Sequence, residues 1–471
     1  MYGFSSCRTT YKTLVAILLK LLIILEVTLS NGLERKLTAV KNPGCEEKCN
    51  NFTFLHVRAD GPNDSLHYLW DFTSKPTVLI AQTSNNASLT ISWYDFLWNI
   101  NSISVKFSEE PKYTFGVIFD KIWEFNDMND TGVMTEVDDA NIVSIVTNEF
   151  QWQLVDLNTN SSDPYLKMRS SNGPRDGSID ILVRPYGSKD HGIELPHLFH
   201  SPNSSQLDIS INNFETNPKF NSSRFAFGLV LFSQDNKKNE TFKIISRKSL
   251  DDEHTPGVFT MNDLVSPHAT ANSKGGGWLL WRKVSYTSEI RDIVNSTEVN
   301  EYAIKNVADH SEALNNTVIY SFHGYNVNDY LVQATNVSFG SKQDVFYSKN
   351  NFTTWTLLVG YGYPLEDELS LLVILVISIG LGLPALLILI GGYQSELRLQ
   401  LILQLVALHL KILKRTLLVG YGYPLEDELS LLVILVISIG LGLPALLILI
   451  GGIYIIHRGF SSKKDELFLS R

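Results

Sequence analysis

The chain has 471 residues and a net charge of −10, and its composition, 44% hydrophobic and 19% charged, is that of a folded protein rather than a disordered one. At roughly 150 residues per domain, the length allows two or three domains. The acidic balance disfavours binding to a nucleic-acid backbone. Three cysteines are too few for a disulfide scaffold or a four-cysteine zinc site.

The N-terminus has the layout of a secretory signal. Basic residues precede a mostly apolar run over 14–29, which ends with small side chains of the kind that a signal peptidase reads. Lys20 and Glu26 interrupt the run, so an uncleaved anchor stays open, although a span needs about twenty nearly uncharged residues. We expect residues 1–30 to be a cleaved signal peptide.

The C-terminal part contains two uncharged apolar runs long enough to cross a bilayer. We expect transmembrane helices at 369–392 and 429–456, joined by a connector at 393–415. Acidic residues precede the runs and basic residues follow the second, which places the tail, 457–471, in the cytosol. Residues 31–365 then form a lumenal domain of a single-pass type I membrane protein.

The two apolar runs belong to a perfect repeat. Residues 356–392 and 416–452 are identical at all 37 positions, whereas structural repeats normally drift in sequence. Identity indicates either a recent duplication or a gene model that joined two alternative last exons. Both copies can keep one orientation only if the connector crosses the membrane, which its polar residues disfavour. We therefore expect one functional span. The polar residues are Arg398, Gln400, Gln404, His409 and Lys411.

The lumenal part has the period-two alternation that is typical of β-strands. It is clearest at 88–93, 178–184, 206–211 and 224–232, with turn-forming residues between these stretches. The fold class that we expect is mainly β, with a β-sandwich-type ectodomain and a C-terminal transmembrane helix. A more polar region at 155–178 could divide the ectodomain into two subdomains.

Cys45 and Cys49 flank three residues in the expected lumenal domain. The oxidising secretory pathway favours a disulfide between them. Because so short a loop constrains little of the unfolded chain, we expect the disulfide only to hold the local turn.

Asn-x-Ser/Thr sequons are unusually dense in this domain, at about twice the number that chance would produce. Glycans attached there would have to lie on the surface, and would obstruct proteases, as a long-lived protein of a degradative compartment requires. The twelve expected N-glycosylation sites are Asn51, Asn63, Asn86, Asn129, Asn160, Asn203, Asn221, Asn239, Asn295, Asn315, Asn336 and Asn351.

The densest group of carboxylates, 251–253 beside His254, is the best candidate for hydrolytic chemistry. Adjacent residues of a strand point to opposite faces, so an exposed turn before Pro256 is the better interpretation. The sequence also lacks the Gly-x-Ser-x-Gly nucleophile motif. We expect no catalytic residues and no cofactor.

A second candidate is a metal site formed by His191, Glu194, His197 and His200, whose spacing would gather ligands on one face of a helix. Pro196 breaks such a helix, so we expect no metal.

Within the expected spans, Ser378 and Gly382 in the first copy, and Ser438 and Gly442 in the second, stand four residues apart. Small residues at this spacing permit close helix packing. Equally, Gly is simply common in membrane helices.

Several segments resemble the glycosylated lysosomal membrane protein family. They are LHVRA at 55–59, LHYLW at 66–70, SLDDEHTPGVF at 249–259, WRKVSY at 281–286 and the GYGYP entry to the span at 360–364. The segments come in the same order as in the family, and the resemblance covers most of the chain. The family has a single span, from which the repeat departs.

The resemblance implies a heavily glycosylated, non-enzymatic protein of the lysosomal membrane. It further implies an accessory subunit that stabilises a lysosomal major-facilitator transporter and protects it from proteolysis. The expected partners are that transporter and the membrane, and a homo-oligomer stays open. Two rival functions remain, a membrane-anchored lumenal hydrolase and a cell-surface adhesion or receptor ectodomain.

Overall fold

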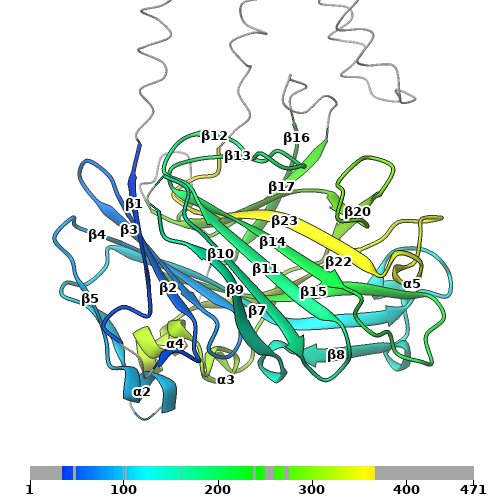
Figure 1. Ribbon diagram of the computed structural model, residues 1–471, viewed down its shortest axis with the longest axis horizontal. Helices are drawn as coiled ribbons and strands as arrows, with labels where there is room; N and C mark the ends of the chain where they lie inside the picture. Colours follow the sequence, from blue (N-terminus) through cyan, green and yellow to red (C-terminus); the bar gives the residue numbers. More distant parts are fainter. Residues whose placement is uncertain are drawn as a thin grey trace, which may run out of the picture. The chain divides into compact units, whose positions relative to one another are not determined.

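The computed structural model describes residues 34–365, except 46–48, 99, 101–102, 161, 237–239, 250–258 and 270–274. Antiparallel strands dominate this part of the chain (Figure 1), so the mainly β class is confirmed. Within the described residues, no helix is long and apolar enough to span a membrane. The expected signal peptide, both expected spans, the connector and the tail lie outside the described residues.

Nineteen strands form one hydrogen-bonded sheet that folds into two layers. The first layer has the order β1-β2-β3-β4-β7-β15-β22, with β8 beside the second half of β7, and β20 and β21 beside β22. Its strands are β1 (Lys36–Lys41), β2 (Phe54–Asp60), β3 (Ser65–Asp71), β4 (Thr77–Thr83), β7 (Tyr113–Asn126), β8 (Ile142–Val146), β15 (Ser223–Asn236), β20 (Ser296–Glu301), β21 (Lys305–Asn306) and β22 (Tyr330–Phe339).

The second layer has the order β9-β10-β11-β14-β23-β18-β17-β16, and β19 pairs with both β23 and β20, which joins the layers. Its strands are β9 (Gln151–Asn158), β10 (Tyr165–Asn172), β11 (Ser178–Pro185), β14 (Ser204–Asn212), β16 (Lys243–Lys248), β17 (Thr260–Val265), β18 (Gly277–Arg282), β19 (Val284–Tyr286) and β23 (Phe352–Tyr361).

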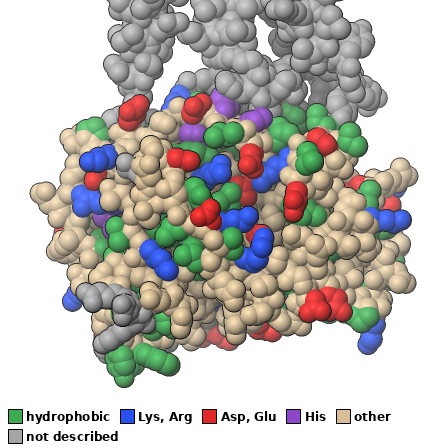
Figure 2. Space-filling view, in the orientation of Figure 1, with side chains coloured by type: hydrophobic (Ala, Val, Ile, Leu, Met, Phe, Trp, Pro, Cys, Tyr) green, Lys and Arg blue, Asp and Glu red, His purple; other side chains and the backbone are tan. Residues whose placement is uncertain are grey.

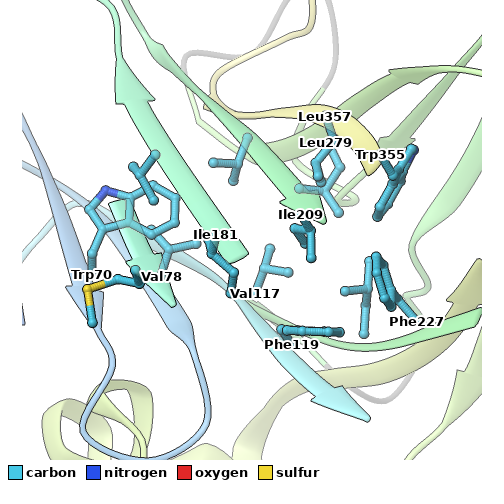
Figure 3. Packing of buried hydrophobic residues seen from close by; sticks show 14 of the residues in the cluster. Trp70, Val78, Val117, Phe119, Ile181, Ile209, Phe227, Leu279, Trp355 and Leu357 are labelled. Atoms are coloured by element: carbon cyan, nitrogen blue, oxygen red, sulfur yellow. The ribbon is translucent and has the colours of Figure 1, made fainter. Parts of the chain in front are cut away.

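The main hydrophobic core lies between the layers (Figure 3). Phe227 of β15 faces the second layer, and its ring centroid lies 6.2 Å from that of Trp355 in β23. The ring of Phe119, from β7, lies 4.9 Å from that of Phe227. Fully burying side chains of this size contributes roughly 1.5–3 kcal/mol each, so this contact region stabilises the packing of the two layers.

Short elements cover the outer face of the first layer and bury a second apolar cluster. Leu69, Leu79 and Phe232 on this face pack against Val318 and Ile319 of a helix. The covering elements are β5 (Leu89–Ile91), β6 (Val105–Phe107), α2 (Trp93–Trp98), α3 (His310–Leu314), α4 (Val318–His323) and the 3-10 helix η5 (Gly324–Asp329). The remaining short elements are β12 (Asp190–His191), β13 (Phe199–His200), α5 (Tyr347–Asn350), η2 (Met134–Glu136), η3 (Asp139–Asn141) and η4 (Thr147–Glu149).

Three of the four strand predictions are confirmed as β11, β14 and β15. The fourth, at 88–93, is right only over the three residues of β5. The hydroxyl of Ser92 donates to Asp95, 2.5 Å away, and Phe96 N donates to the Ser92 carbonyl, so a helix begins where the strand was expected to continue. The polar region at 155–178 forms the end of β9, all of β10 and the turn before β11, within the second layer.

Candidate functional site

The sequons are spread over the described domain. Eleven of the twelve asparagines are described, and Asn239 is not. None of the eleven is buried, and ten lie outside regular strands and helices, whereas Asn336 lies within β22. Asn203, Asn295 and Asn336 are partly exposed, and the other eight are exposed. An attached glycan must reach solvent, and none of the described sequon asparagines is buried away from it.

The strands of the second layer contain no sequon asparagine. Several of their outward side chains are instead charged, and Figure 2 shows both signs of charge where Figure 1 places β10, β11 and β14. Arg169 donates two hydrogen bonds to Asp180 across β10 and β11, at 2.7 and 2.6 Å. Arg291 donates to Asp208 at 2.8 Å and to the Leu195 carbonyl at 2.6 Å, which ties together two loops beside this face. We call the outward surface of β9, β10, β11 and β14 the charged face.

The two ends of the described chain meet at Asn203. Arg35 Nε donates to Asn203 Oδ1 at 2.6 Å, and Tyr361 N donates to the Asn203 carbonyl at 2.9 Å. Arg35 N also donates to the Gly187 carbonyl at 2.7 Å. The segments that continue toward the expected signal and the expected span therefore leave the domain from one place.

Cys45 and Cys49 form a disulfide, with their Cα atoms 6.0 Å apart. The side chain of Asn42 holds the adjacent turn, because its Nδ2 donates to the Cys49 carbonyl at 2.9 Å and its Oδ1 accepts from Phe54 N at 2.9 Å. The bridge therefore lies in the connection between β1 and β2, away from the core between the layers.

The four residues of the candidate metal site lie on a strand hairpin rather than a helix. His191 is in β12 and His200 in β13, and the two flank the turn that holds Glu194 and His197. His197 Nδ1 bonds to the Gly192 carbonyl at 2.7 Å, and the ring of His200 stacks on Tyr186 with centroids 3.4 Å apart. Burial lowers the pKa of His200 to about 4.

The remaining predicted sites cannot be placed. The carboxylates at 251–253 and His254 lie outside the described residues, as do the small residues of the expected spans, Ser378, Gly382, Ser438 and Gly442.

One cluster was missed by sequence reasoning. Asp235, Glu240 and His268 bring three potential ligand atoms within 4.8 Å of one another, within the described part of the chain. The buried carboxylate of Asp235 already accepts from the Tyr113 hydroxyl, and its other oxygen contacts His268 Nδ1. Burial raises the pKa of Tyr113 well above its ordinary value. No local motif revealed this cluster, because His268 lies 33 residues after Asp235 in the chain.

A cleft of about 230 Å³ opens between β6, β7 and the segment of α4 and η5. Phe107, Phe322 and Tyr330 give it aromatic walls. Thr114 and His323 also line it, with Oγ1 and Nε2 3.0 Å apart. Burial lowers the pKa of His323 to about 3, so this imidazole is a poor base and the pair does not make an activated hydroxyl.

Comparison with known proteins gives a consistent result. A family model described as "Glycosylated lysosomal membrane protein" matches residues 53–398 and 407–461, and each range contains one copy of the perfect repeat. A solved structure of galactose 1-epimerase from Lactobacillus acidophilus is 9% identical and covers 71% of this chain and all of its own, but the TM-score of 0.30 supports no argument.

Curated relatives carry the same family name and no enzymatic name. Glycosylated lysosomal membrane protein B of Xenopus laevis is 29% identical over 368 residues, which cover 76% of this chain and 88% of the relative. The protein of Danio rerio is 27% identical over 379 residues, covering 77% and 89%. The protein of Homo sapiens is 23% identical over 350 residues, covering 72% and 82%. Since the family model covers most of the chain, this protein belongs to the glycosylated lysosomal membrane protein family.

Proposed function

We propose that this protein is a non-enzymatic accessory subunit of the lysosomal membrane, which stabilises a transporter of the major-facilitator type and protects it from proteolysis. The proposed topology is single-pass type I, with residues 31–365 in the lumen and 457–471 in the cytosol. The observation that carries the proposal is the distribution of sequons. Eleven of them reach solvent around one domain, and the strands of the second layer have none.

Glycans at these positions would surround the domain with hydrated, bulky groups. A protease must bind an extended stretch of backbone, and ten of the described sequon asparagines lie in the connections between strands and helices. The domain would therefore survive in a degradative lumen, and a partner packed against it would share that protection.

The charged face is the surface that we propose for the partner. Paired Arg and Asp side chains are typical of polar interfaces, in which they set orientation and specificity. Two exposed aliphatic residues on the loops that Arg291 joins, Ile193 at 84% and Ile290 at 77% exposure, supply apolar anchors at its edge. A second copy of the chain could use the same face, which would make a homo-oligomer.

A membrane-anchored hydrolase is the second candidate, and the cluster of Asp235, Glu240 and His268 favours it. A carboxylate paired with an imidazole is a common acid–base arrangement. Both oxygens of Asp235 are occupied, however, and the neighbouring hydroxyl of Tyr113 has a raised pKa, which makes it a weak nucleophile at acid pH.

Depletion of the protein, followed by quantitative proteomics of purified lysosomes, tests the proposed role. We expect the abundance of at least one multispan transporter to fall while its mRNA is unchanged, and we expect re-expression to restore it. If every multispan lysosomal transporter keeps its abundance, the accessory role is wrong. Re-expression of an Asp235→Asn variant separates this role from the hydrolase. An accessory subunit should restore the abundance of the transporter as well as the wild type does, whereas a hydrolase that uses Asp235 should not.

The charged face can be tested with one added glycan. Arg169→Asn creates the sequon Asn-Ser-Ser on β10. The side chain of Arg169 is partly exposed, so a glycan at this position can reach solvent. Arg169→Gln removes the same ion pair without adding a sequon. If the transporter docks here, Arg169→Asn should abolish its co-purification and Arg169→Gln should retain most of it. Equal co-purification with a confirmed glycan on the new site would exclude this face.

A further inference from the structure

We propose that the first N-acetylglucosamine of the glycan on Asn336 packs on the indole of Trp123. The proposal shares one premise with the proposed function, passage through the secretory pathway, and does not depend on a transporter. Among the described sequon asparagines, Asn336 is the one inside a strand. Its glycan therefore begins on the face of a sheet rather than at a turn.

The side chain of Asn336 points to the outer face of the first layer. Its neighbour Val337 and the later Phe339 belong to the core between the layers, and strand alternation directs Asn336 the opposite way. Strand β15 pairs on one side of it, and Tyr302 N donates to its carbonyl on the other side at 3.1 Å. A sugar attached here therefore has sheet surface beneath it on both sides.

Gly228 has no side chain, and this leaves room for the contact between the sugar and the indole. Gly228 is the cross-strand partner of Asn336 on one side and of Lys121 on the other. A Cβ at Gly228 would lie 3.0 Å from Trp123 Nε1 and 3.3 Å from Asn336 Oδ1. The indole and the asparagine amide thus approach each other over a position that has no side chain.

Two polar groups at this place lack protein partners. Trp123 Nε1 is buried without a hydrogen bond, and within the described residues the side chain of Asn336 makes none. Buried indole N–H groups normally find an acceptor. A glycosylated asparagine keeps its carbonyl oxygen, and the sugar adds an acetamide and hydroxyls, so the linked sugar supplies acceptors next to Nε1.

The indole is also a fixed and accessible platform. It packs against the cluster of Phe125, Met134 and Ala226, and it is itself only partly buried. Lys121 Nζ lies 5.6 Å from its ring centroid. The apolar C–H face of a pyranose packs on an aromatic ring, and the ammonium group can donate to the sugar hydroxyls.

The test measures how fast each glycan is removed from the folded protein. The full chain is produced in cells that N-glycosylate, treated with peptide-N-glycosidase F without denaturant, and sampled over time for glycopeptide mass spectrometry. Asn221, on an exposed turn before β15, is the internal control. Stacking of about 0.5–1.5 kcal/mol predicts that release from Asn336 is up to about tenfold slower than from Asn221.

Two variants complete the test. Asn336→Gln should lower the thermal unfolding midpoint more than Asn221→Gln does, because it alone removes a packed sugar. Trp123→Leu should speed release from Asn336 to the Asn221 rate; if that variant does not fold, the release rates in the wild-type protein still decide. If Asn221 carries a glycan and Asn336 either carries none or releases its glycan equally fast, the proposed packing on Trp123 is wrong and the proposed function is unaffected. A chain without any N-glycan overturns the secretory premise, and with it the proposed function.

Discussion

Four histidines set how the stability of the described domain responds to acid: His67, His200 and His323 are buried, and His56 is partly exposed. Desolvation lowers the pKa of His56 and His200 to about 4, and of His67 and His323 to about 3. The unfolded chain binds protons at these residues below pH 6.5, whereas the folded protein does so only near pH 3–4. The contribution of these histidines to stability is therefore full above pH 6.5 and is lost as the pH drops toward 4.

Asp71 acts in the opposite direction. Burial raises its pKa from 3.8 to about 6, against the effect of hydrogen bonds from Thr73 and Val318. Its stabilising contribution is full below pH 3.8 and is lost as the pH rises through about 6. Acidification to lysosomal pH thus restores part of what the histidines lose.

His323→Gln tests the histidine effect at one site. Between pH 7 and pH 5, a histidine with a folded pKa of about 3 should lower the free energy of unfolding by roughly 2 kcal/mol. Glutamine can still bond to Thr114 and cannot be protonated in this range. Urea unfolding at both pH values, followed by circular dichroism, should show a pH-dependent loss smaller by about that amount. An unchanged pH dependence would contradict this prediction.

Two nearby glycines allow a matched comparison of packing. A Cβ on Gly277 would lie 1.9 Å from a ring atom of Phe115, in the core between the layers. At Gly275 the nearest atom would be the Tyr361 hydroxyl at 3.7 Å, an ordinary contact. We expect Gly277→Ala to lower the free energy of unfolding by about 1–3 kcal/mol and Gly275→Ala to change it little. Equal effects in urea unfolding would mean that Phe115 moves aside.

At the scale of elements, the strands that were predicted are those whose sequence alternates between apolar and polar residues or is a long apolar run. Strand β15 was predicted although its residues Ser223–Ser233 are all buried. Strand β11 alternates between buried and partly exposed residues throughout, and it was predicted. Strand β3 is buried at all seven positions, because helices and the β5–β6 hairpin cover the outer face of the first layer. The sequences of β3 (SLHYLWD) and β4 (TVLIAQT) do not alternate between apolar and polar residues, so these two strands were not found in this way.

The same reasoning explains which parts of the candidate site were predictable. A sequon is a local pattern, so all twelve could be named from the sequence. The contacts of Asn203 with Arg35 and Tyr361, and the cluster around Asp235, join segments that are distant in the chain. They depend on strand pairing, which a single sequence does not contain.

Helix α4 offers a prediction about capping that can be separated from glycosylation. Thr317 caps the helix, and its hydroxyl accepts from Tyr320 N and donates to the Leu314 carbonyl at 2.6 Å. Thr317 is also the third residue of the Asn315 sequon. Thr317→Ala should lower the free energy of unfolding by about 1–2 kcal/mol more than Asn315→Gln, which removes only the sequon. Thr317→Ser keeps both functions and is the control; equal losses for Thr317→Ala and Asn315→Gln would assign the whole effect to the glycan.

At the scale of the whole molecule, both ends of the described chain lie at Asn203, and this constrains how the domain is attached to the proposed membrane anchor. Strand β1 begins next to Arg35, and β23, which ends at Tyr361, is the central strand of the second layer. In the proposed topology the domain is held by the segment after β23. In that topology, a force applied there would act directly on a strand paired with β14 and β18, and β14 is one of the strands of the charged face.

The perfect repeat decides how many such anchors exist, and both of its apolar copies lie outside the described residues. Two spans of equal orientation would require the connector at 393–415 to cross the membrane with Arg398 and Lys411 inside it, which is energetically unfavourable. If the connector stays in the cytosol, the second copy must reverse and carry the basic tail into the lumen. The family model matches one copy within 53–398 and the other within 407–461.

We therefore expect the native message to encode one copy of the 37-residue segment. Long-read sequencing of the mRNA decides this, with reads that span from the codons of β23 to the stop codon. Separate messages that each contain one copy would confirm alternative last exons. A single message with both copies would contradict the prediction. Protease protection of a C-terminal tag would then measure the orientation of the second copy, since only a cytosolic tail is digested in intact vesicles.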